Sequence, residues 1–257
     1  MKTTYALSAC LLLLLYAPTE SRSQTAISDF SQIHLFRDFA AARATTPKTV
    51  LDLAVRNDFC TKELMLKELA FSWNKNQNCL LVSASHYGYK HYGTLTASAG
   101  YGRMFGRKFS VAMRIFYLLQ HATHYPSRHS VTIDLSSCWQ ITPATSLAVM
   151  IYNPIGLHYG IIGNELIPMT FAVQLHYMPT ARLAGTLTTS KTIPGKFNIR
   201  IGLAYFASPH LYLNGYCDLA QCRIELHVPW RNLVFSLGTA WFYHTGFSPQ
   251  GFLYFFI

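Results

Sequence analysis

The segment Lys108–Gln120, KFSVAMRIFYLLQ, decides the fold class. Apolar or aromatic side chains occupy every second position from Phe109 to Leu119, and most positions between them carry small or polar residues such as Ser110 and Arg114. Successive side chains of a β-strand point to opposite faces, so this alternation predicts one strand with an apolar face and a wet or small-residue face. Its thirteen residues exceed the five or six that are usual for strands of soluble proteins.

The same alternation recurs along the chain, for example in Arg128–Gln140, Lys196–Ala207 and Gln221–Val228. The repetition predicts an all-β protein with about 14 strands. The expected strands are 48–56, 66–73, 79–87, 93–103, 108–120, 128–140, 145–153, 168–178, 181–191, 196–207, 210–218, 221–228, 232–243 and 250–257.

Composition narrows the class further. Half of the chain (51%) is hydrophobic and only 12% is charged, against about 25% charged residues in an ordinary soluble domain. No apolar run after residue 20 approaches the roughly 18 residues of a membrane-spanning helix. Apolar composition without helical spans leaves a transmembrane β-barrel or a dense soluble β core.

The first 23 residues have the pattern of a secretory signal peptide. Lys2 precedes an apolar stretch at Ala6–Ala17, and small residues before Gln24 offer a cleavage site after Ser23. Removing residues 1–23 leaves 19 basic and 10 acidic residues, a net charge of +9. The basic residues are scattered singly and form no run or stripe, which argues against nucleic-acid binding.

Three regions are therefore expected: a signal peptide at 1–23, an N-terminal segment at 24–47 and a barrel at 48–257. Within the second region, Ser28–Arg43 has the apolar periodicity of a short helix. This segment is interpreted either as a plug of the lumen or as a periplasmic tether.

The connections between the predicted strands fall into two classes. The longer ones, 57–65, 121–127, 154–167 and 244–249, all follow odd-numbered strands, and the short ones mostly follow even-numbered strands. An even strand count with short periplasmic turns and longer outer loops is typical of a transmembrane antiparallel up-and-down β-barrel of the bacterial outer membrane. Both chain ends then lie on the periplasmic side.

Aromatic residues near strand ends agree with such a barrel, because Trp and Tyr gather at membrane–water interfaces. The candidates for this girdle are Tyr87, Tyr101, Trp139, Tyr177, Trp241 and Tyr243. A soluble secreted sandwich or lipocalin-like barrel ranks lower, because the faces opposite the apolar ones carry too many small residues for a solvated surface.

Several turn and strand motifs resemble small outer-membrane proteins of the Bacteroidota, the PorV/PorQ-like branch of the FadL-type barrels. They include His86–Tyr92 (HYGYKHY), Gly100–Arg103 (GYGR), Tyr152–Gly156 (YNPIG) and Ser248–Gly251 (SPQG). The resemblance covers residues 48–257 and implies a fourteen-stranded barrel in the outer membrane of a Gram-negative bacterium, in contact with its lipid. The Gly-rich hatch of that family has no counterpart in Gln24–Pro47, a departure that weighs against long-chain lipid transport.

The alternation turns several charged residues toward the lumen. Those singled out as lumen-lining are Arg114, Asp134, Arg182, Arg200, Arg223 and Glu225. Lumen charges tune the selectivity of a pore, and an excess of Arg favours anionic solutes. The alternative is an internal ion-pair network that supports the wall.

Two functions follow as expectations. The first is passive or gated transport of a small hydrophobic or anionic solute. The alternative is a non-conducting scaffold that binds a protein partner, as the shuttle proteins of type IX secretion do in the family that the chain resembles. In that case the apolar loop 154–167 would hold the partner through Leu157, Ile161 and Ile162.

No enzyme, cofactor or metal is predicted. His176, His227 and several serines are present, but no spacing joins them into a catalytic motif. The histidines of the expected outer loops have no carboxylate or cysteine at ligand spacing. Cys217 and Cys222 flank a short turn and are candidates for a disulfide, with free thiols as the alternative.

Overall fold

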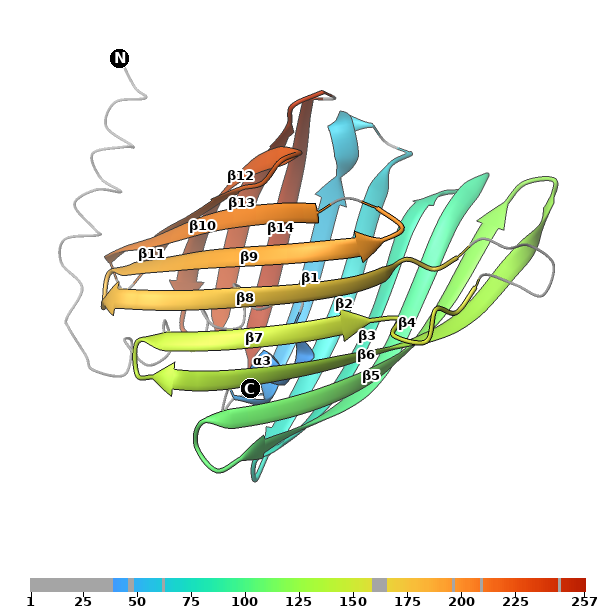
Figure 1. The fold of residues 1–257 in the computed structure, drawn as a ribbon. Helices are drawn as coiled ribbons and strands as arrows, with labels where there is room; N and C mark the ends of the chain where they lie inside the picture. Colours follow the sequence, from blue (N-terminus) through green and yellow to red (C-terminus); the bar gives the residue numbers. More distant parts are fainter. Residues whose placement is uncertain are drawn as a thin grey trace, which may run out of the picture.

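The computed structural model describes residues 39–45, 49–61, 63–158, 166–195, 197–208, 210–244 and 246–257. Its strands form one closed antiparallel barrel in which each strand pairs with its neighbours in sequence and β1 pairs with β14 (Figure 1). The fourteen strands are β1 (Val50–Asn57), β2 (Met65–Lys75), β3 (Asn78–Tyr89), β4 (Tyr92–Phe105), β5 (Phe109–Ala122), β6 (Tyr125–Thr142), β7 (Thr145–Tyr152), β8 (Met169–Thr180), β9 (Leu183–Ile193), β10 (Phe197–Ser208), β11 (Leu211–Cys217), β12 (Gln221–Trp230), β13 (Leu233–Phe242) and β14 (Gly246–Phe256). All fourteen predicted strands are confirmed, most within three residues at each end.

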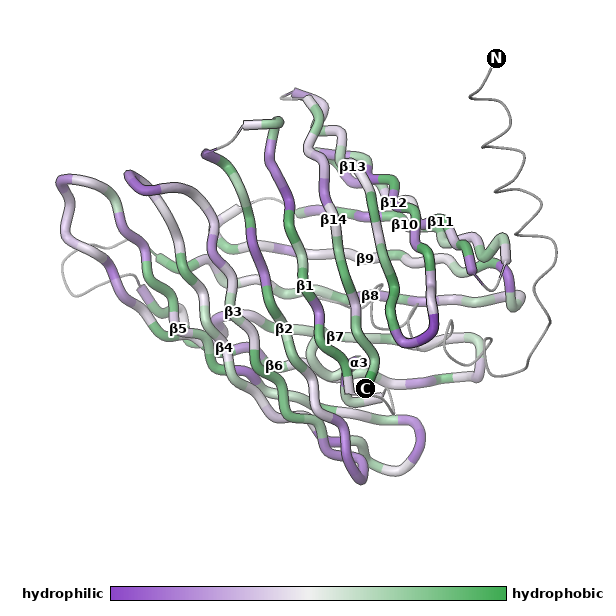
Figure 2. The backbone as a smooth tube through the Cα atoms, turned by 180° about the vertical axis from the view of Figure 1, so that it is seen from behind, coloured by the Kyte–Doolittle hydropathy of each residue, from purple (hydrophilic) through white to green (hydrophobic). Residues whose placement is uncertain are grey.

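The alternation in the sequence separates the two faces of the wall. In β5 the odd-numbered residues from Phe109 to Tyr117 are exposed on the outside, and Ser110 and Ala112 are buried inside. An apolar exterior is what a barrel needs in order to face lipid, since closure pairs the backbone groups of its strands internally. Figure 2 shows hydrophilic residues concentrated at turns and strand tips, with hydrophobic stretches between them.

The two ends of the barrel differ. The end that holds the first residue of β1 and the last residue of β14 has short turns, and we call it the turn end. The opposite end, which we call the loop end, carries the longer connections Asp58–Leu64 and 153–168. The first of these includes the 3₁₀ turn η1 (Asp58–Cys60), whose Phe59 ring packs edge-on against Phe242.

Two of the predicted loops are wrong. The expected loop 121–127 is largely strand, because β5 and β6 continue to a two-residue turn at Thr123 and His124, where His124 adopts a positive φ of 73°. The expected loop 244–249 is also mostly strand, since β14 begins at Gly246. Hairpin pairing therefore extends the wall at these places, and the length asymmetry between the ends comes from the two remaining loops.

Five of the six aromatic residues predicted for the girdle are about half exposed on the outer surface: Tyr101, Trp139, Tyr177, Trp241 and Tyr243. Tyr87 is the exception. It has the parity of Ser83 and Ser85, which line the lumen, and its side chain hydrogen-bonds to Asp58. Side chains at odd and even positions of a strand point to opposite faces, so an error of one position moves a predicted ring from the outer surface to the lumen.

The lumen is filled in its turn-end half. A short helix, α3 (Ala40–Ala44), lies inside the barrel against β3, β4, β5 and β6 (Figure 1). The expected helix Ser28–Arg43 overlaps α3, and its remainder lies outside the described residues, as does the expected signal peptide. No helix in the described part of the chain has the length and hydropathy needed to span a bilayer.

Small wall residues make room for α3. Its alanines pack on Ala112, Cys138 and Ala148, all of them buried. Ser110 Oγ donates a hydrogen bond to the Ala41 carbonyl at 2.7 Å, and the Ala41 amide donates to Ser136 Oγ at 3.0 Å. A Cβ on Gly102 would come within 3.2 Å of Ala44 Cβ, so glycine permits this close approach.

The rest of the turn-end half is filled by a buried aromatic cluster. Its rings are Phe206, Tyr212, Phe252, Tyr254 and Phe256, each at most 8% exposed, and Val50 and Met178 pack with them. These residues come from β1, β8, β10, β11 and β14, on the side of the lumen opposite α3. Helix and aromatic cluster together occupy the turn-end half of the lumen.

Candidate functional site

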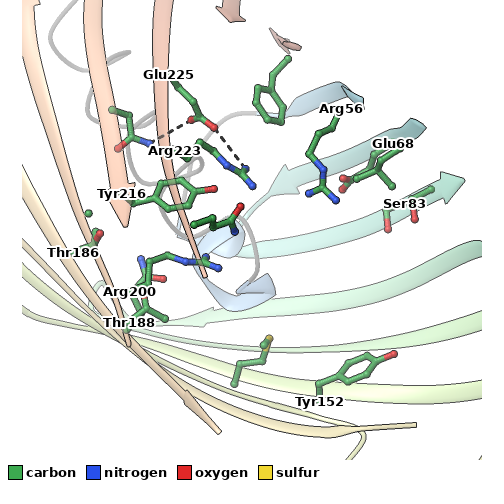
Figure 3. Close-up of a pocket in the computed structure, with 18 of the residues that line it drawn as sticks. Arg56, Glu68, Ser83, Tyr152, Thr186, Thr188, Arg200, Tyr216, Arg223 and Glu225 are labelled. Atoms are coloured by element: carbon green, nitrogen blue, oxygen red, sulfur yellow. Dashed lines mark hydrogen bonds and ion pairs between the residues drawn. The ribbon is translucent and has the colours of Figure 1, made fainter. Parts of the chain in front are cut away.

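The loop-end half of the lumen holds a cavity of about 600 Å³, within the range that is typical of small-molecule sites. Most of the side chains that line it are polar, and they come from strands all around the barrel. Arg200, Tyr216 and Arg223 lie together on one side, and Arg56 and Glu68 face them across the cavity (Figure 3). The apolar lining is limited to Leu66, Phe116, Met150, Gly202 and Phe252.

One ion pair is built into the wall between β5 and β6. The register places Arg114 opposite Asp134. Arg114 donates from Nε at 2.8 Å and also from Nη2 to the same carboxylate oxygen, and Asp134 is fully buried. A buried carboxylate needs such a partner, because its desolvation would otherwise cost several kcal/mol.

A second, mixed cluster surrounds Glu225 on the opposite wall. Gln250 Nε2 donates to Oε1 of Glu225 at 2.6 Å, and Asn214 Nδ2 lies 3.4 Å from Oε2. Nη1 of Arg223 is 3.7 Å from the same carboxylate. Glu225 is 1% exposed, so this carboxylate is held by neutral donors as much as by a cation.

The structure brings together three residues that sequence spacing did not. Ser236 lies opposite His227 in the β12–β13 register, with Oγ 2.5 Å from Nδ1, and His227 Nε2 is 3.4 Å from Glu225 Oε2. Their spacing in the sequence forms no motif, and it is the pairing of β12 with β13 that brings Ser236 next to His227. All three are at most 2% exposed, and Tyr212 stacks on the imidazole at 4.3 Å. The group lies beneath the cavity as a packed polar network.

The filled half contains a further ion pair. Arg43 of α3 and Asp52 of β1 form a hydrogen-bonded pair with side chains 7% and 2% exposed. The pair ties the helix to the strand on the far side of its alanine contacts. Removing either member would leave the other charged and buried.

Five of the six predicted lumen residues line the cavity: Arg114, Asp134, Arg200, Arg223 and Glu225. The predicted lumen position of Arg182 is wrong, because this residue lies exposed in the turn between β8 and β9 at the turn end. The prediction began the ninth strand at residue 181, two residues before β9 begins, and in a turn the alternation no longer fixes the direction of a side chain. The cavity is also lined by Tyr216 and Asn214, whose positions next to Arg223 and Glu225 depend on the register between β11 and β12.

The predicted partner loop is described only in part, since Ile161 and Ile162 lie outside the described residues. Leu157 is partly buried, and its amide donates to Asn153 Oδ1 at 3.0 Å. Asn153 also donates to the carbonyl of Ile167 at 2.6 Å, so one buried amide closes both ends of the loop. Ile155 and Leu166 are exposed apolar residues of this region.

The remaining predictions concern cysteines and metals. Cys217 and Cys222 face each other in the β11–β12 hairpin and form a disulfide. Cys79 and Cys138 are free and buried, and Cys60 is free and exposed. Among the described residues, no group of three or more His, Cys, Asp or Glu side chains is placed to hold a metal ion.

Comparison with solved structures places this fold among outer-membrane channels. The chain is similar to the TodX deltaS2S3 mutant monoaromatic hydrocarbon channel, with a TM-score of 0.62 and 8% identity over 86% of this chain and 92% of that one. It is similar to a Pseudomonas aeruginosa FadL homologue, with a TM-score of 0.57 and 8% identity over 84% and 90%. The CymD monoaromatic hydrocarbon channel gives 0.55 and 9% over 83% and 90%.

No family model and no curated protein matches the sequence. The likeness to solved structures, at these identities, is one of fold. The chain thus has the FadL-type barrel fold, which resembles outer-membrane proteins of Gram-negative bacteria.

Proposed function

We propose that the protein is an outer-membrane channel for small anionic solutes, which enter the barrel from the loop end. The observation that carries this proposal is the cavity whose lining holds four arginines, among hydroxyl and amide side chains and three carboxylates. The arginines are Arg56, Arg114, Arg200 and Arg223, and the carboxylates are Glu68, Asp134 and Glu225. A hydrophobic solute, the other class expected from the sequence, finds few apolar contacts there. Arginine side chains in a lumen favour anions over cations and neutral molecules.

The proposal includes gating at the turn end. Residues 24–47 act as a plug, and α3 within this segment contacts the wall. In support, α3 rests on small residues and is tied to β1 by the Arg43–Asp52 pair. A solute that reaches the cavity passes to the periplasm when this segment moves.

Solute flux into liposomes tests the proposal. Mature protein, residues 24–257, would be reconstituted, and swelling would be measured in isotonic benzoate and in neutral sugars of similar size. We expect flux that favours the anion and that rises when residues 24–47 are deleted. Equal rates in protein-free liposomes and in liposomes with either form of the protein would contradict the proposal.

The scaffold function is a second candidate, supported by the exposed Ile155 and Leu166 at the loop end. The PorV/PorQ resemblance and a secretion-system partner belong to this candidate. It predicts that the parent chain captures a protein partner without conducting solute, and that deleting the tip of loop 154–167 abolishes the capture. The channel proposal predicts that neither the parent chain nor this deletion variant captures a partner from secretion complexes.

A further inference from the structure

The four arginines of the cavity are not equivalent. Arg56 donates to both carboxylate oxygens of Asp58, at 2.7 and 3.1 Å. Arg114 makes two hydrogen bonds to Asp134. These pairs engage two of the five N–H donors of each guanidinium and offset its charge with an adjacent carboxylate, so Arg56 and Arg114 are each firmly held by a carboxylate.

Arg200 and Arg223 are held more weakly. Nε of Arg200 lies 3.4 Å from Asp218, and Nη1 of Arg223 lies 3.7 Å from Glu225, both beyond the usual length of a charged hydrogen bond. Nε of Arg223 is buried and has no hydrogen-bond partner in the described part of the chain. These two side chains therefore retain donors that can bind an anion.

A single ring holds the two guanidiniums together. The Tyr216 ring centroid is 5.1 Å from Cζ of Arg200 and 4.9 Å from Cζ of Arg223, within the range of cation–π contact. Tyr216 lies opposite Gly202 and Arg223 in the sheet register. A Cβ on Gly202 would lie 2.3 Å from Thr186 Oγ1 and 3.5 Å from Tyr216 Cβ, so glycine lets the Thr186 hydroxyl approach the wall beside Tyr216.

The local charge balance selects the kind of anion. Asp218 and Glu225 bring two negative charges next to the two guanidiniums. The site is thus close to neutral, and an anion with two charges would be repelled by both carboxylates. A single carboxylate with its planar pair of oxygens matches the free guanidinium donors.

We propose that Arg200, Tyr216 and Arg223 form a binding site for the carboxylate of a small monoanionic organic acid. This inference rests on the proposed function and names its solute class. The body of the acid lies in the remaining cavity, where Phe116 and Met150 supply apolar surface.

Calorimetric titration of the folded full chain in non-ionic detergent tests the site, with benzoate as the probe, benzamide as its neutral analogue and inorganic phosphate as an anion of higher mean charge. We expect benzoate to bind at least tenfold more tightly than either of the others. R200Q and R223Q should each weaken benzoate binding about tenfold or more. R182Q, which removes the same charge from an exposed turn, is the matched control and should leave binding unchanged.

D218N supplies a variant with the opposite effect. The asparagine oxygen can still accept from the amides of Ala220 and Gln221, which Asp218 Oδ1 binds at 2.8 and 3.0 Å. Only the charge that competes for Arg200 is removed, so benzoate affinity should rise several-fold. Gains and losses of affinity in two folded variants cannot both come from misfolding.

Three results would overturn the inference: equal affinity for benzoate and benzamide, tighter binding of phosphate than of benzoate, or equal weakening by R182Q and R223Q. If benzoate does not bind but anion flux is intact, the binding site is contradicted and the channel function is not. If benzoate binding follows the predicted pattern but no flux is measured, the binding site is supported and the transport function is contradicted. Folding of each variant is checked by heat-modifiable migration.

Discussion

The two halves of the lumen are built from the same strands but differ in content. The turn-end half is filled by α3 and by aromatic rings, and its Arg43–Asp52 pair is sealed from solvent. The loop-end half keeps a cavity of about 600 Å³ lined by polar side chains. Under the proposed function, the filled half serves closure and the half with the cavity serves solute contact.

The largest effect is expected from D52N, which removes the carboxylate that pairs with the buried guanidinium of Arg43 in the filled half. Breaking a buried pair in this way costs about 3–5 kcal/mol, so α3 should leave its place more often. In a C60S background, the buried thiols of Cys79 and Cys138 report this movement, because both lie in the cluster around α3.

Maleimide labelling provides the measurement. Both thiols should be protected in the C60S protein and labelled in the D52N variant, with R182Q as the control that changes an exposed charge. Protection that persists in D52N would show that the pair does not hold the helix.

A somewhat smaller effect is expected from R114Q in the loop-end half. Asp134 would lose its partner, but Arg114 borders the cavity and is 17% exposed, so water can compensate in part. We expect a loss near the lower end of about 3–5 kcal/mol, measured by urea unfolding in lipid vesicles. The double variant R114L/D134L should recover most of the loss, and a double variant as unstable as R114Q would contradict this explanation.

The features of the fold and of the cavity that could be predicted from the sequence are those that depend on local interactions. Alternation fixes the face of a residue, so the strands and the lumen positions of Arg114 and Asp134 follow from the sequence. Contacts such as Ser236 with His227 depend on the register between strands, which the sequence does not specify by spacing. The position of Arg182 and the extent of β6 depend on where hairpins turn, and turn residues signal this only weakly.

Removing the Cys217–Cys222 disulfide should have a modest effect. The closed loop is short, with a sequence separation of five, so its removal costs at most about 2 kcal/mol by the chain-entropy estimate. Strand pairing already sets the two residues opposite each other. C217S/C222S should unfold at slightly lower urea than the parent, and a loss as large as that of R114Q would contradict the expectation.

The smallest effect concerns Asp218 in the loop between β11 and β12. Burial raises the pKa of its carboxyl, but hydrogen bonds from the Ala220 and Gln221 amides and the charge of Arg200 outweigh this, so the pKa is lowered overall. A lowered pKa means that the stabilisation is present above the unfolded value of about 3.9 and is lost as the pH falls through the folded pKa. The stability difference between the wild type and D218N should therefore shrink between pH 6 and pH 3, and a difference that grows on acidification would contradict the assignment.

The most direct test of the separation between closure and solute contact is single-channel conductance in a planar bilayer. The mature chain would be compared with a variant that lacks residues 24–47, after both are shown to migrate as folded barrels. Our account predicts little or no current through the mature chain and a steady, anion-selective current after the deletion. Equal steady currents in both proteins, or silence in both, would contradict it.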